Sequence, residues 1–180
     1  PGSGVGGPCL PINSYQFLNT AKRMGSNLSI IESGRKINEH MPEHVIKLTL
    51  DAFEECNKSI KGSTILILGV SYKPNVKDIQ LTPAEIIIKK LQELGANIRI
   101  YDPYFKTNDV FGIKCEENLD DVFTNVNATL IVTGHDEFKK YEISKFSQTI
   151  DKILIDTRGI IEPTSAKDAN LVFRGLGRGQ

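Results

Sequence analysis

Residues 64–70 read TILILGV, a continuous apolar run with the length of a β-strand that is buried on both faces. Further on, Thr82-Pro83-Ala84-Glu85 supplies an N-cap residue, a proline at the first helical position and a glutamate at the third, so a helix is predicted to begin there. Gly95 follows the apolar residues of this helix and predicts its end. The segment is therefore expected to form a strand, a turn and a helix.

The same alternation continues to the end of the chain. Strand-length apolar runs recur at 97–101, 128–133, 152–156 and 170–173, with helical stretches near 118–125 and 142–148. Strands and helices that alternate through short connections are typical of a parallel sheet with helices on both faces. We therefore predict an α/β fold, with a doubly wound, mostly parallel, Rossmann-like sheet over residues 61–180.

Residues 12 to about 60 have a helical pattern instead. Their apolar positions step by three or four, along Ile30, Gly34, Ile37, Met41, Val45, Leu48, Ala52 and Cys56. Pro42 predicts either a kink in one long helix or a second helix that begins near it. We expect a helical arm that is too thin to bury its own apolar face. A homodimer or a higher homo-oligomer would cover that face.

Composition narrows the class of protein. The chain has 180 residues, with 22 basic and 22 acidic side chains, and this balance argues against a nucleic-acid partner. No apolar run approaches the ~20 residues that span a bilayer, so no membrane partner is expected. The glycine-rich start has neither the charged nor the apolar region of a signal peptide. Three scattered cysteines favour a reducing compartment, and hence a cytoplasmic location.

Cys9 is the cysteine with the clearest chemical context. It follows a glycine-rich stretch and precedes a predicted helix, where backbone N–H groups stabilise a thiolate and make it a nucleophile. The alternative is that a tight loop requires a small residue at this position. Cys56 and Cys115 lie in a helical face and a strand-like segment, and we expect both to be structural.

The turn after the first strand differs from a dinucleotide-binding loop. It reads GVSYKPN at 69–75, with one glycine where the G-x-G-x-x-G pattern has three, and Lys73 stands where a phosphate would lie. Asp102 ends the second strand, a position that often binds a ribose hydroxyl. These residues predict a nucleotide crevice that is not built for the NAD pyrophosphate. The alternative is a Rossmann-like scaffold with an ordinary loop lysine.

The histidines allow further hypotheses. His40 and His44 match the zinc pattern H-x-x-E-H, but Pro42 between them disturbs the helix and no third ligand is evident, so no metal is predicted. A solvated or interface helix face is the preferred interpretation. His135 follows the strand at 128–133, where it would either stabilise a loop or contact a ligand.

Four motifs occur in a defined order: PGSGVGGPCLP at 1–11, INEHMPEHV at 37–45, GVSYKPNVKD at 69–78 with IRIYDPY at 98–104, and IDTRGII at 155–161. Together they resemble the UDP-glucose/GDP-mannose dehydrogenase family of nucleotide-sugar 6-dehydrogenases. The glycine loop before Cys9 and the segment from His40 to His44 look most like the UDP-N-acetylmannosamine or UDP-N-acetylglucosamine branch.

The resemblance implies a division of the chain. Residues 1–60 match the cysteine loop and the central helical region used in dimerisation, and residues 61–180 match the C-terminal UDP-binding domain. The family's N-terminal NAD-binding domain is absent from this chain, which alone is expected to be inactive. Such enzymes act in polysaccharide biosynthesis and use NAD to oxidise the C6 alcohol of a UDP-sugar twice, through a thioester on the cysteine.

The resemblance also implies roles for individual residues. Cys9 matches the catalytic nucleophile, and Tyr72, Lys73 and Arg158 match substrate contacts. The glycine loop that packs on the substrate corresponds to Gly2, Ser3, Gly4, Val5 and Gly6.

Two positions depart from the family pattern. Asn13 replaces an aspartate that assists thioester hydrolysis, and Gln80 replaces an arginine that reaches the NAD pyrophosphate. An active but divergent enzyme is one interpretation of these changes. The other is an inactive paralogue, or a non-catalytic module that binds UDP-sugars or dimerises.

Overall fold

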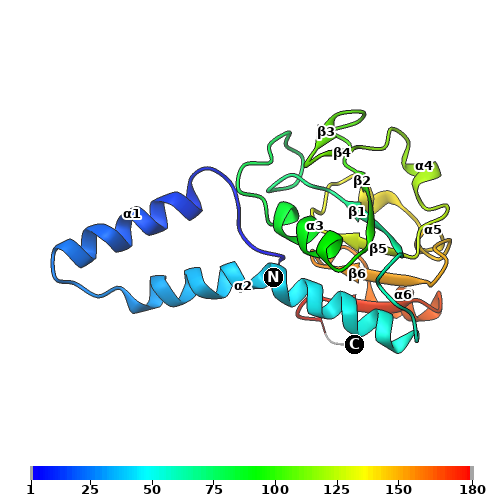
Figure 1. Cartoon of the computed structure of the whole chain (residues 1–180), viewed down its shortest axis with the longest axis horizontal. Helices are drawn as coiled ribbons and strands as arrows, with labels where there is room; N and C mark the ends of the chain where they lie inside the picture. The colour runs from blue at the N-terminus through cyan, green and yellow to red at the C-terminus, as the bar shows by residue number, and fades with distance from the viewer. Residues whose placement is uncertain (1, 179–180) are drawn as a thin grey trace.

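The computed structural model describes residues 2–178, without the side chains of Leu119 and Asp120. A helical arm precedes an α/β domain (Figure 1). The arm consists of α1 (Leu10–Arg23) and α2 (Ser29–Glu55). The domain follows in the order β1 (Thr64–Leu68), α3 (Pro83–Glu93), β2 (Asn97–Tyr101), β3 (Asp109–Val110), β4 (Ile113–Lys114), α4 (Leu119–Val122), β5 (Ala128–Ile131), the 3₁₀ helix η1 (Phe138–Lys140), α5 (Ile143–Phe146), β6 (Ile153–Asp156), α6 (Pro163–Asp168) and β7 (Val172–Gly175).

Five strands form one parallel sheet in the order β2-β1-β5-β6-β7, which confirms the predicted fold class. Ile65 of β1 pairs with Ile98 on one side and with Ala128 on the other. The chain therefore crosses from one side of β1 to the other between β2 and β5. In open α/β sheets, ligands bind outside the carboxyl ends of the strands at such a switch point. A ligand site is therefore expected at the carboxyl ends of β1 and β5.

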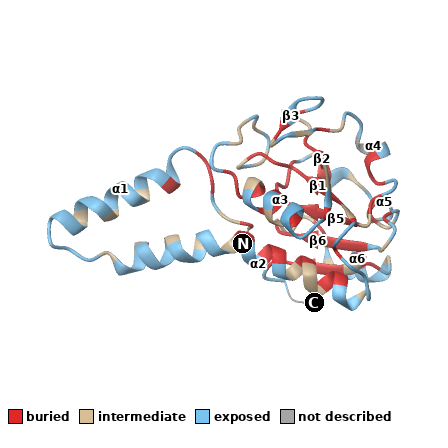
Figure 2. Ribbon diagram, viewed as in Figure 1, coloured by how far each residue is buried: buried red, intermediate tan, exposed pale blue. Residues whose placement is uncertain are grey.

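The alternation of side chains along β1 explains why both faces of the sheet are covered. Ile65 and Ile67 pack in a cluster with the buried residues of α2 and α3. Leu66 and Leu68 point to the other face, where they join buried side chains from the segments around α4, α5 and α6. The continuous apolar run therefore contributes to two cores at once (Figure 2).

Several local features of the sequence act as expected. The Thr82 hydroxyl caps α3 by accepting a hydrogen bond from the Ala84 N–H at 3.3 Å. Gly95 follows the end of α3 with a φ of 85°, a left-handed conformation that glycine adopts readily. Both α4 and α5 are single turns within the predicted helical stretches. The β3–β4 hairpin and α6 were not predicted.

The arm resolves the question raised by Pro42, because α2 continues through it as one helix. In the first half of α2, Ile30 and Ile37 of the predicted apolar face are 87% and 65% exposed, as expected for an arm that is too thin to bury this face. The second half is buried against the domain, through Val45 and Ile46 among others. The first half extends past the domain beside α1, so the domain cannot cover it (Figure 2).

None of the helices within residues 2–178 combines the length and the apolar character needed to cross a membrane.

Candidate functional site

The loop before Cys9 is attached to both parts of the molecule. The Val5 N–H donates to Asn38 Oδ1 of α2 at 2.7 Å, and Asn38 Nδ2 donates back to the Val5 carbonyl at 3.3 Å. The Gly7 N–H donates to the Gln80 carbonyl, in the segment before α3, at 2.9 Å. Because backbone groups make these contacts, the path of the loop is fixed between the arm and the domain.

Glycine is required where this loop meets the domain. A Cβ atom on Gly6 would lie 2.3 Å from the Leu81 carbonyl oxygen, and one on Gly7 would lie 2.7 Å from the Tyr72 ring. A Cβ atom on Gly2 would lie 2.4 Å from Nη1 of Arg158. Of the predicted substrate contacts, Arg158 thus lies directly against the predicted glycine loop at Gly2, and Tyr72 lies against Gly7, the residue that follows this loop. Ser3 of this loop is buried, and Val5 is exposed.

Cys9 occupies the N-cap position of α1, and its thiol is exposed. Its side chain makes no capping hydrogen bond, while its carbonyl accepts the Asn13 N–H at 2.9 Å. The exposed Asn13 side chain lies one helical turn further along. Cys9 thus places an accessible sulfur at the start of a 14-residue helix.

The other two cysteines differ in their surroundings. Burial raises the pKa of the Cys115 thiol to about 12. Burial also raises the pKa of Cys56, whose Sγ lies 3.8 Å from the Asp151 carbonyl oxygen. Both thiols are held in the protonated form, as befits structural residues.

The loop after β1 begins at Gly69, which lies close to Thr133 just after β5. Gly69 has a φ of 81°, and a Cβ atom there would lie 2.6 Å from the carbonyl oxygen of Thr133. The Thr133 hydroxyl donates to the Ser71 carbonyl at 2.5 Å. The single glycine of this turn therefore serves packing between the two strand ends rather than close approach to a pyrophosphate.

Lys73 and Gln80 lie at the surface of this loop. The Lys73 ammonium lies 5.6 Å from the centre of the Tyr72 ring, which contacts Gly7 of the cysteine loop. The Gln80 N–H donates to Asp78 Oδ1 at 2.9 Å, and its carbonyl holds Gly7. Lys73 is thus an exposed cation beside the cysteine loop.

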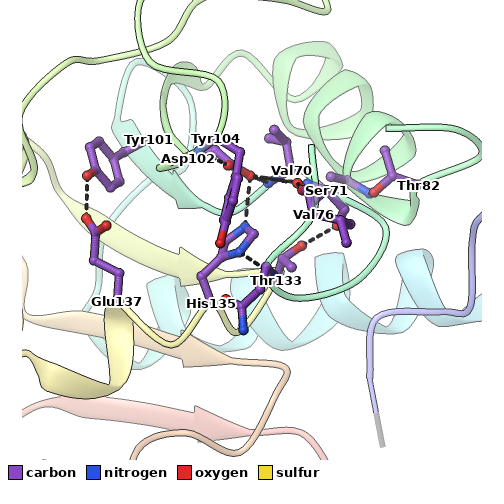
Figure 3. Close-up of polar contacts among 12 residues, drawn as sticks. Val70, Ser71, Val76, Thr82, Tyr101, Asp102, Tyr104, Thr133, His135 and Glu137 are labelled. Carbon is purple, nitrogen blue, oxygen red and sulfur yellow. Dashed lines mark hydrogen bonds and ion pairs between the residues drawn. The ribbon is translucent and has the colours of Figure 1, made fainter. Parts of the chain in front are cut away.

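Asp102 does not face a ligand, contrary to the hypothesis that it contacts a ribose. Its carboxylate is fully buried and accepts hydrogen bonds from the N–H groups of Val70 at 2.8 Å, Ser71 at 3.3 Å and Tyr104 at 2.9 Å (Figure 3). A carboxylate saturated by backbone donors fixes the start of the loop after β1.

His135 completes this buried network, so its loop-stabilising alternative is confirmed. Its Nε2 lies 3.0 Å from Asp102 Oδ2, and its Nδ1 accepts the Asn75 N–H at 2.9 Å (Figure 3). Because Nδ1 accepts a hydrogen bond, the ring N–H lies on Nε2, which donates to Asp102. Burial tends to raise the pKa of Asp102, but hydrogen bonds from His135 and the backbone outweigh it and lower that pKa.

Tyr101 and Glu137 form a second pair at this edge of the sheet. The Tyr101 hydroxyl donates to Glu137 Oε1, and burial together with this carboxylate raises the pKa of Tyr101. The phenol is therefore a stable hydrogen-bond donor that ties the end of β2 to the segment after β5.

Arg158 lies on the loop after β6, which Asp156 shapes. Asp156 Oδ1 accepts the N–H groups of Arg158 and Gly159 at 2.8 and 2.9 Å. The half-buried Arg158 side chain passes Gly134, where a Cβ atom would lie 3.1 Å from the Arg158 Cβ, and ends beside Gly2. Burial lowers its pKa, although guanidinium groups stay charged in proteins.

Sequence reasoning missed Asn38 and Asp156 as residues that build the site. Asp156 could have been found, because it ends a buried strand as Asp102 does and precedes a short Arg-Gly turn. No local signal marks Asn38, since its partner lies 33 positions away in the sequence.

His40 and His44 both lie on the exposed side of α2. Nδ1 of His40 lies 2.6 Å from the Lys36 carbonyl oxygen in the preceding turn. In the part of the chain that the structure describes, no group of three or more His, Cys, Asp or Glu side chains is arranged to hold a metal ion.

Comparison with known proteins agrees with this geometry. Residues 66–163 match the UDP-binding domain of the UDP-glucose/GDP-mannose dehydrogenase family, and residues 1–40 match the central domain of the same family. The chain belongs to this family. The UDP-binding match covers all of the strand-end loops described above, and the central-domain match covers the cysteine loop, α1 and the first part of α2.

Relatives in the family are dehydrogenases of several nucleotide sugars. The chain is 33% identical to UDP-N-acetyl-D-mannosamine dehydrogenase of Pyrococcus horikoshii, over 99% of this chain and 40% of that protein. It is 31% identical to UDP-glucose 6-dehydrogenase of Bacillus subtilis, over 98% of this chain and 39% of that protein. The chain therefore spans about 40% of the length of these relatives.

Solved structures show the same fold. The Pyrococcus horikoshii UDP-D-ManNAc dehydrogenase matches with a TM-score of 0.86 over 99% of this chain and 40% of that chain. An NDP-N-acetyl-D-galactosaminuronic acid dehydrogenase from Methanosarcina mazei matches with a TM-score of 0.89 at 29% identity, over 99% of this chain and 39% of that one.

Gly6→Ala should displace the cysteine loop from the domain, because the added methyl would collide with the backbone carbonyl of Leu81. We expect the free energy of unfolding to fall by about 1–3 kcal/mol, measured by urea denaturation. Gly34→Ala is the control, because no atom lies within 4 Å of its Cβ position and alanine favours the helix. Equal stability of the two variants would show that the loop does not depend on this contact.

Asp102→Asn should lower the free energy of unfolding by about 3 kcal/mol at neutral pH, because the charged acceptor of buried donors is lost. Since the pKa of Asp102 is lowered in the folded protein, its ionised form stabilises the fold above the ordinary pKa of about 3.9. That stabilisation is lost as the pH falls below this value. Denaturation at several pH values should therefore show wild type and variant converging below about pH 4.

The control for this comparison is Asp121→Asn at an exposed position, where we expect a change within about 0.5 kcal/mol at every pH. A difference between wild type and Asp102→Asn that stays constant with pH would contradict the assignment.

Proposed function

We propose that this chain forms the cysteine-bearing and nucleotide-binding part of an NAD-dependent nucleotide-sugar dehydrogenase. Its reaction is the two-step oxidation of the C6 alcohol of a UDP-hexose or UDP-(N-acetyl)hexosamine to the uronate. The observation that carries this proposal is the packing of the glycine loop before Cys9 against Tyr72 and Arg158 at the carboxyl edge of the sheet. Residues 1–60 then act as the catalytic loop and dimerisation region, and residues 61–180 as the UDP-binding domain.

The charges at this edge suit a diphosphate. Lys73 presents an ammonium beside Tyr72, and Arg158 presents a guanidinium beside Gly2, so two cations flank the loop that leads to Cys9. Lysine binds phosphate as a point charge, and arginine binds it through a planar fork of donors. The missing side chains at Gly2, Gly4 and Gly6 let the loop pack closely on Arg158, Pro83 and Leu81.

The described residues do not fit NAD. The loop after β1 has one glycine where the G-x-G-x-x-G pattern has three, and this glycine packs on Thr133. In this proposal NAD accepts hydride while bound mainly by residues outside this sequence, and Gln80 is the contact from this chain.

The role of Cys9 follows from its exposure at the start of α1. Its thiolate attacks the C6 aldehyde of the intermediate, and the resulting alkoxide takes up a proton to give a thiohemiacetal. Once this adduct has been oxidised to the thioester, water adds to the acyl carbon and the thiolate leaves with the uronate released. Asn13 lies one turn along α1 and can orient that water by hydrogen bonding, but it cannot accept its proton.

The second candidate is a non-catalytic UDP-sugar-binding or dimerisation module, or an inactive paralogue, in the same cytoplasmic setting. The neutral side chains of Asn13 and Gln80 favour it, because neither supplies the charge that the family pattern has there. The two functions share nucleotide binding and differ in whether Cys9 forms an acyl adduct.

Isothermal titration calorimetry of this chain should detect binding of UDP and weaker or no binding of NAD. Lys73→Ala and Arg158→Ala should each weaken UDP binding by about 10-fold or more, because each removes a charge-assisted hydrogen bond. Lys61→Ala is the matched control, since this exposed lysine precedes the opposite end of β1 and should leave the affinity unchanged. Binding of NAD more tightly than UDP would overturn the proposal.

We also propose that the arm mediates self-association. Leu10, Ile12, Phe17, Met24 and Ile30 are exposed on α1 and α2. A groove of about 440 Å³ between the arm and α3 is lined mainly by apolar side chains, including Val5, Tyr15 and Ile86. A large apolar surface of this kind is typical of an interface, and a symmetric homodimer is the commonest solution.

Sedimentation velocity should show a dimer or larger assembly, and Ile12→Asp should shift it toward monomer at the same concentration. Aspartate in the first turn of a helix is favourable, so α1 itself should remain intact. Ile150→Asp, at an apolar residue 62% exposed on the domain, should leave the assembly unchanged. A monomer at high concentration for the wild-type chain would count against the proposal.

A further inference from the structure

The loop that carries Tyr72 and Lys73 is held at both ends of its path. At its start, the N–H groups of Val70 and Ser71 donate to the buried Asp102 carboxylate. The Ser71 hydroxyl donates to the Val76 carbonyl at 2.7 Å, and the Tyr72 N–H donates to the Asp78 carbonyl at 3.0 Å, so the loop closes on itself.

The middle of the loop depends on a different contact. Asn75, two positions after Lys73, has a φ of 62°, and its N–H donates to Nδ1 of His135 at 2.9 Å. Its Nδ2 donates to Asp136 Oδ2 at 2.7 Å, and its Oδ1 accepts a hydrogen bond from the Asp136 N–H at 3.2 Å. Asp136 is exposed, whereas His135 is fully buried, so the His135 contact is the one shielded from water.

The His135 ring makes hydrogen bonds through both of its nitrogens. Its ring lies between Tyr104, with centroids 5.2 Å apart, and Phe138, with centroids 5.4 Å apart. Its Nε2 donates to Asp102, which holds the start of the loop, and its Nδ1 accepts from Asn75 beyond Lys73. One buried side chain therefore links the two anchor points on either side of Tyr72 and Lys73.

We propose that His135 is a positioning residue for the nucleotide, which sets the place of Lys73 and Tyr72 through its Nδ1 contact with Asn75. This inference rests on the proposed binding of UDP and assigns His135 a role beyond stability. A lysine side chain is flexible, so the position of its ammonium depends on where its backbone is fixed. Loss of the Asn75 contact would leave Lys73 on a loop fixed at its ends but not at its centre, and ligand binding would then have to order it.

Two variants separate the hydrogen bond of His135 with Asp102 from its hydrogen bond with Asn75. His135→Gln places an amide nitrogen near the position of Nε2 and keeps a donor for Asp102, but it has no acceptor near the position of Nδ1. His135→Asn places an amide oxygen near the position of Nδ1 and keeps an acceptor for Asn75, but it does not reach Asp102. The shorter Asn also leaves a larger cavity between Tyr104 and Phe138, so it should be the less stable variant.

Calorimetry of this chain with UDP, amide hydrogen exchange and thermal unfolding test the proposal together. In His135→Gln, we expect UDP binding to weaken by about 3- to 10-fold and the Asn75 amide to exchange faster by a similar factor. In His135→Asn, both quantities should stay within about 2-fold of wild type despite its lower melting temperature. Affinity would then follow the Asn75 contact and not stability.

Other outcomes overturn the proposal. If the affinities of both variants fall in the order of their melting temperatures, His135 has only a structural role. If His135→Gln binds UDP as wild type does while its Asn75 amide exchanges faster, the loop centre does not position the ligand contacts. If the wild-type chain does not bind UDP, the proposed function fails. The exchange rates at Asn75 then decide separately whether His135 holds the loop.

Discussion

The candidate site depends on one buried carboxylate at the switch point of the sheet. Asp102 is fully enclosed, and the cost of removing its charge from water is offset by donors from three strand-end segments. Val70 follows β1, Tyr104 follows β2 and His135 follows β5, so the carboxylate joins three connections that the sheet alone leaves independent. A hydrogen bond to an ionised group in a dry environment is stronger than a neutral one. The loop that carries Tyr72 and Lys73 is therefore held in place by the hydrogen bonds of Asp102.

The arm, in contrast to this buried site, is largely exposed. A cavity of about 510 Å³ lies between α1 and α2, bordered by polar residues such as Asn19 and Glu32, so these helices do not form a close-packed pair. The second half of α2 contributes Val45 and Phe53 to the main core and needs no partner. The first half and α1 keep apolar side chains in water, an arrangement that a second copy of the chain would relieve.

Periodicity and strand length were enough to predict the sheet. A strand that is buried on both faces has a continuous apolar run, such as that of residues 64–70. Spacing alone did not distinguish Ile30 and Ile37, which stay exposed, from Val45 and Ile46, which are buried, since it shows which residues share a helix face but not how far the covering domain extends. The partners of Asp102 could not be predicted either. An aspartate at the end of a strand gives the same sequence pattern whether its carboxylate binds a ribose hydroxyl or backbone N–H groups. Only the positions of β1, β2 and β5 decide between these two uses.

The contacts of glycine constrain the kind of substrate further. Gly7 touches the Tyr72 ring, Cys9 follows it by two residues, and Lys73 adjoins Tyr72. Consecutive Cα atoms are about 3.8 Å apart, so the Cys9 thiol and the Lys73 cation are carried on backbone segments only a few residues from one shared contact. Arg158 reaches the other end of the same loop at Gly2. Under the function proposed above, a nucleotide diphosphate would lie along this loop and use the cations at both of its ends, whereas a free carboxylate or an isolated aldehyde would use only one end of the surface.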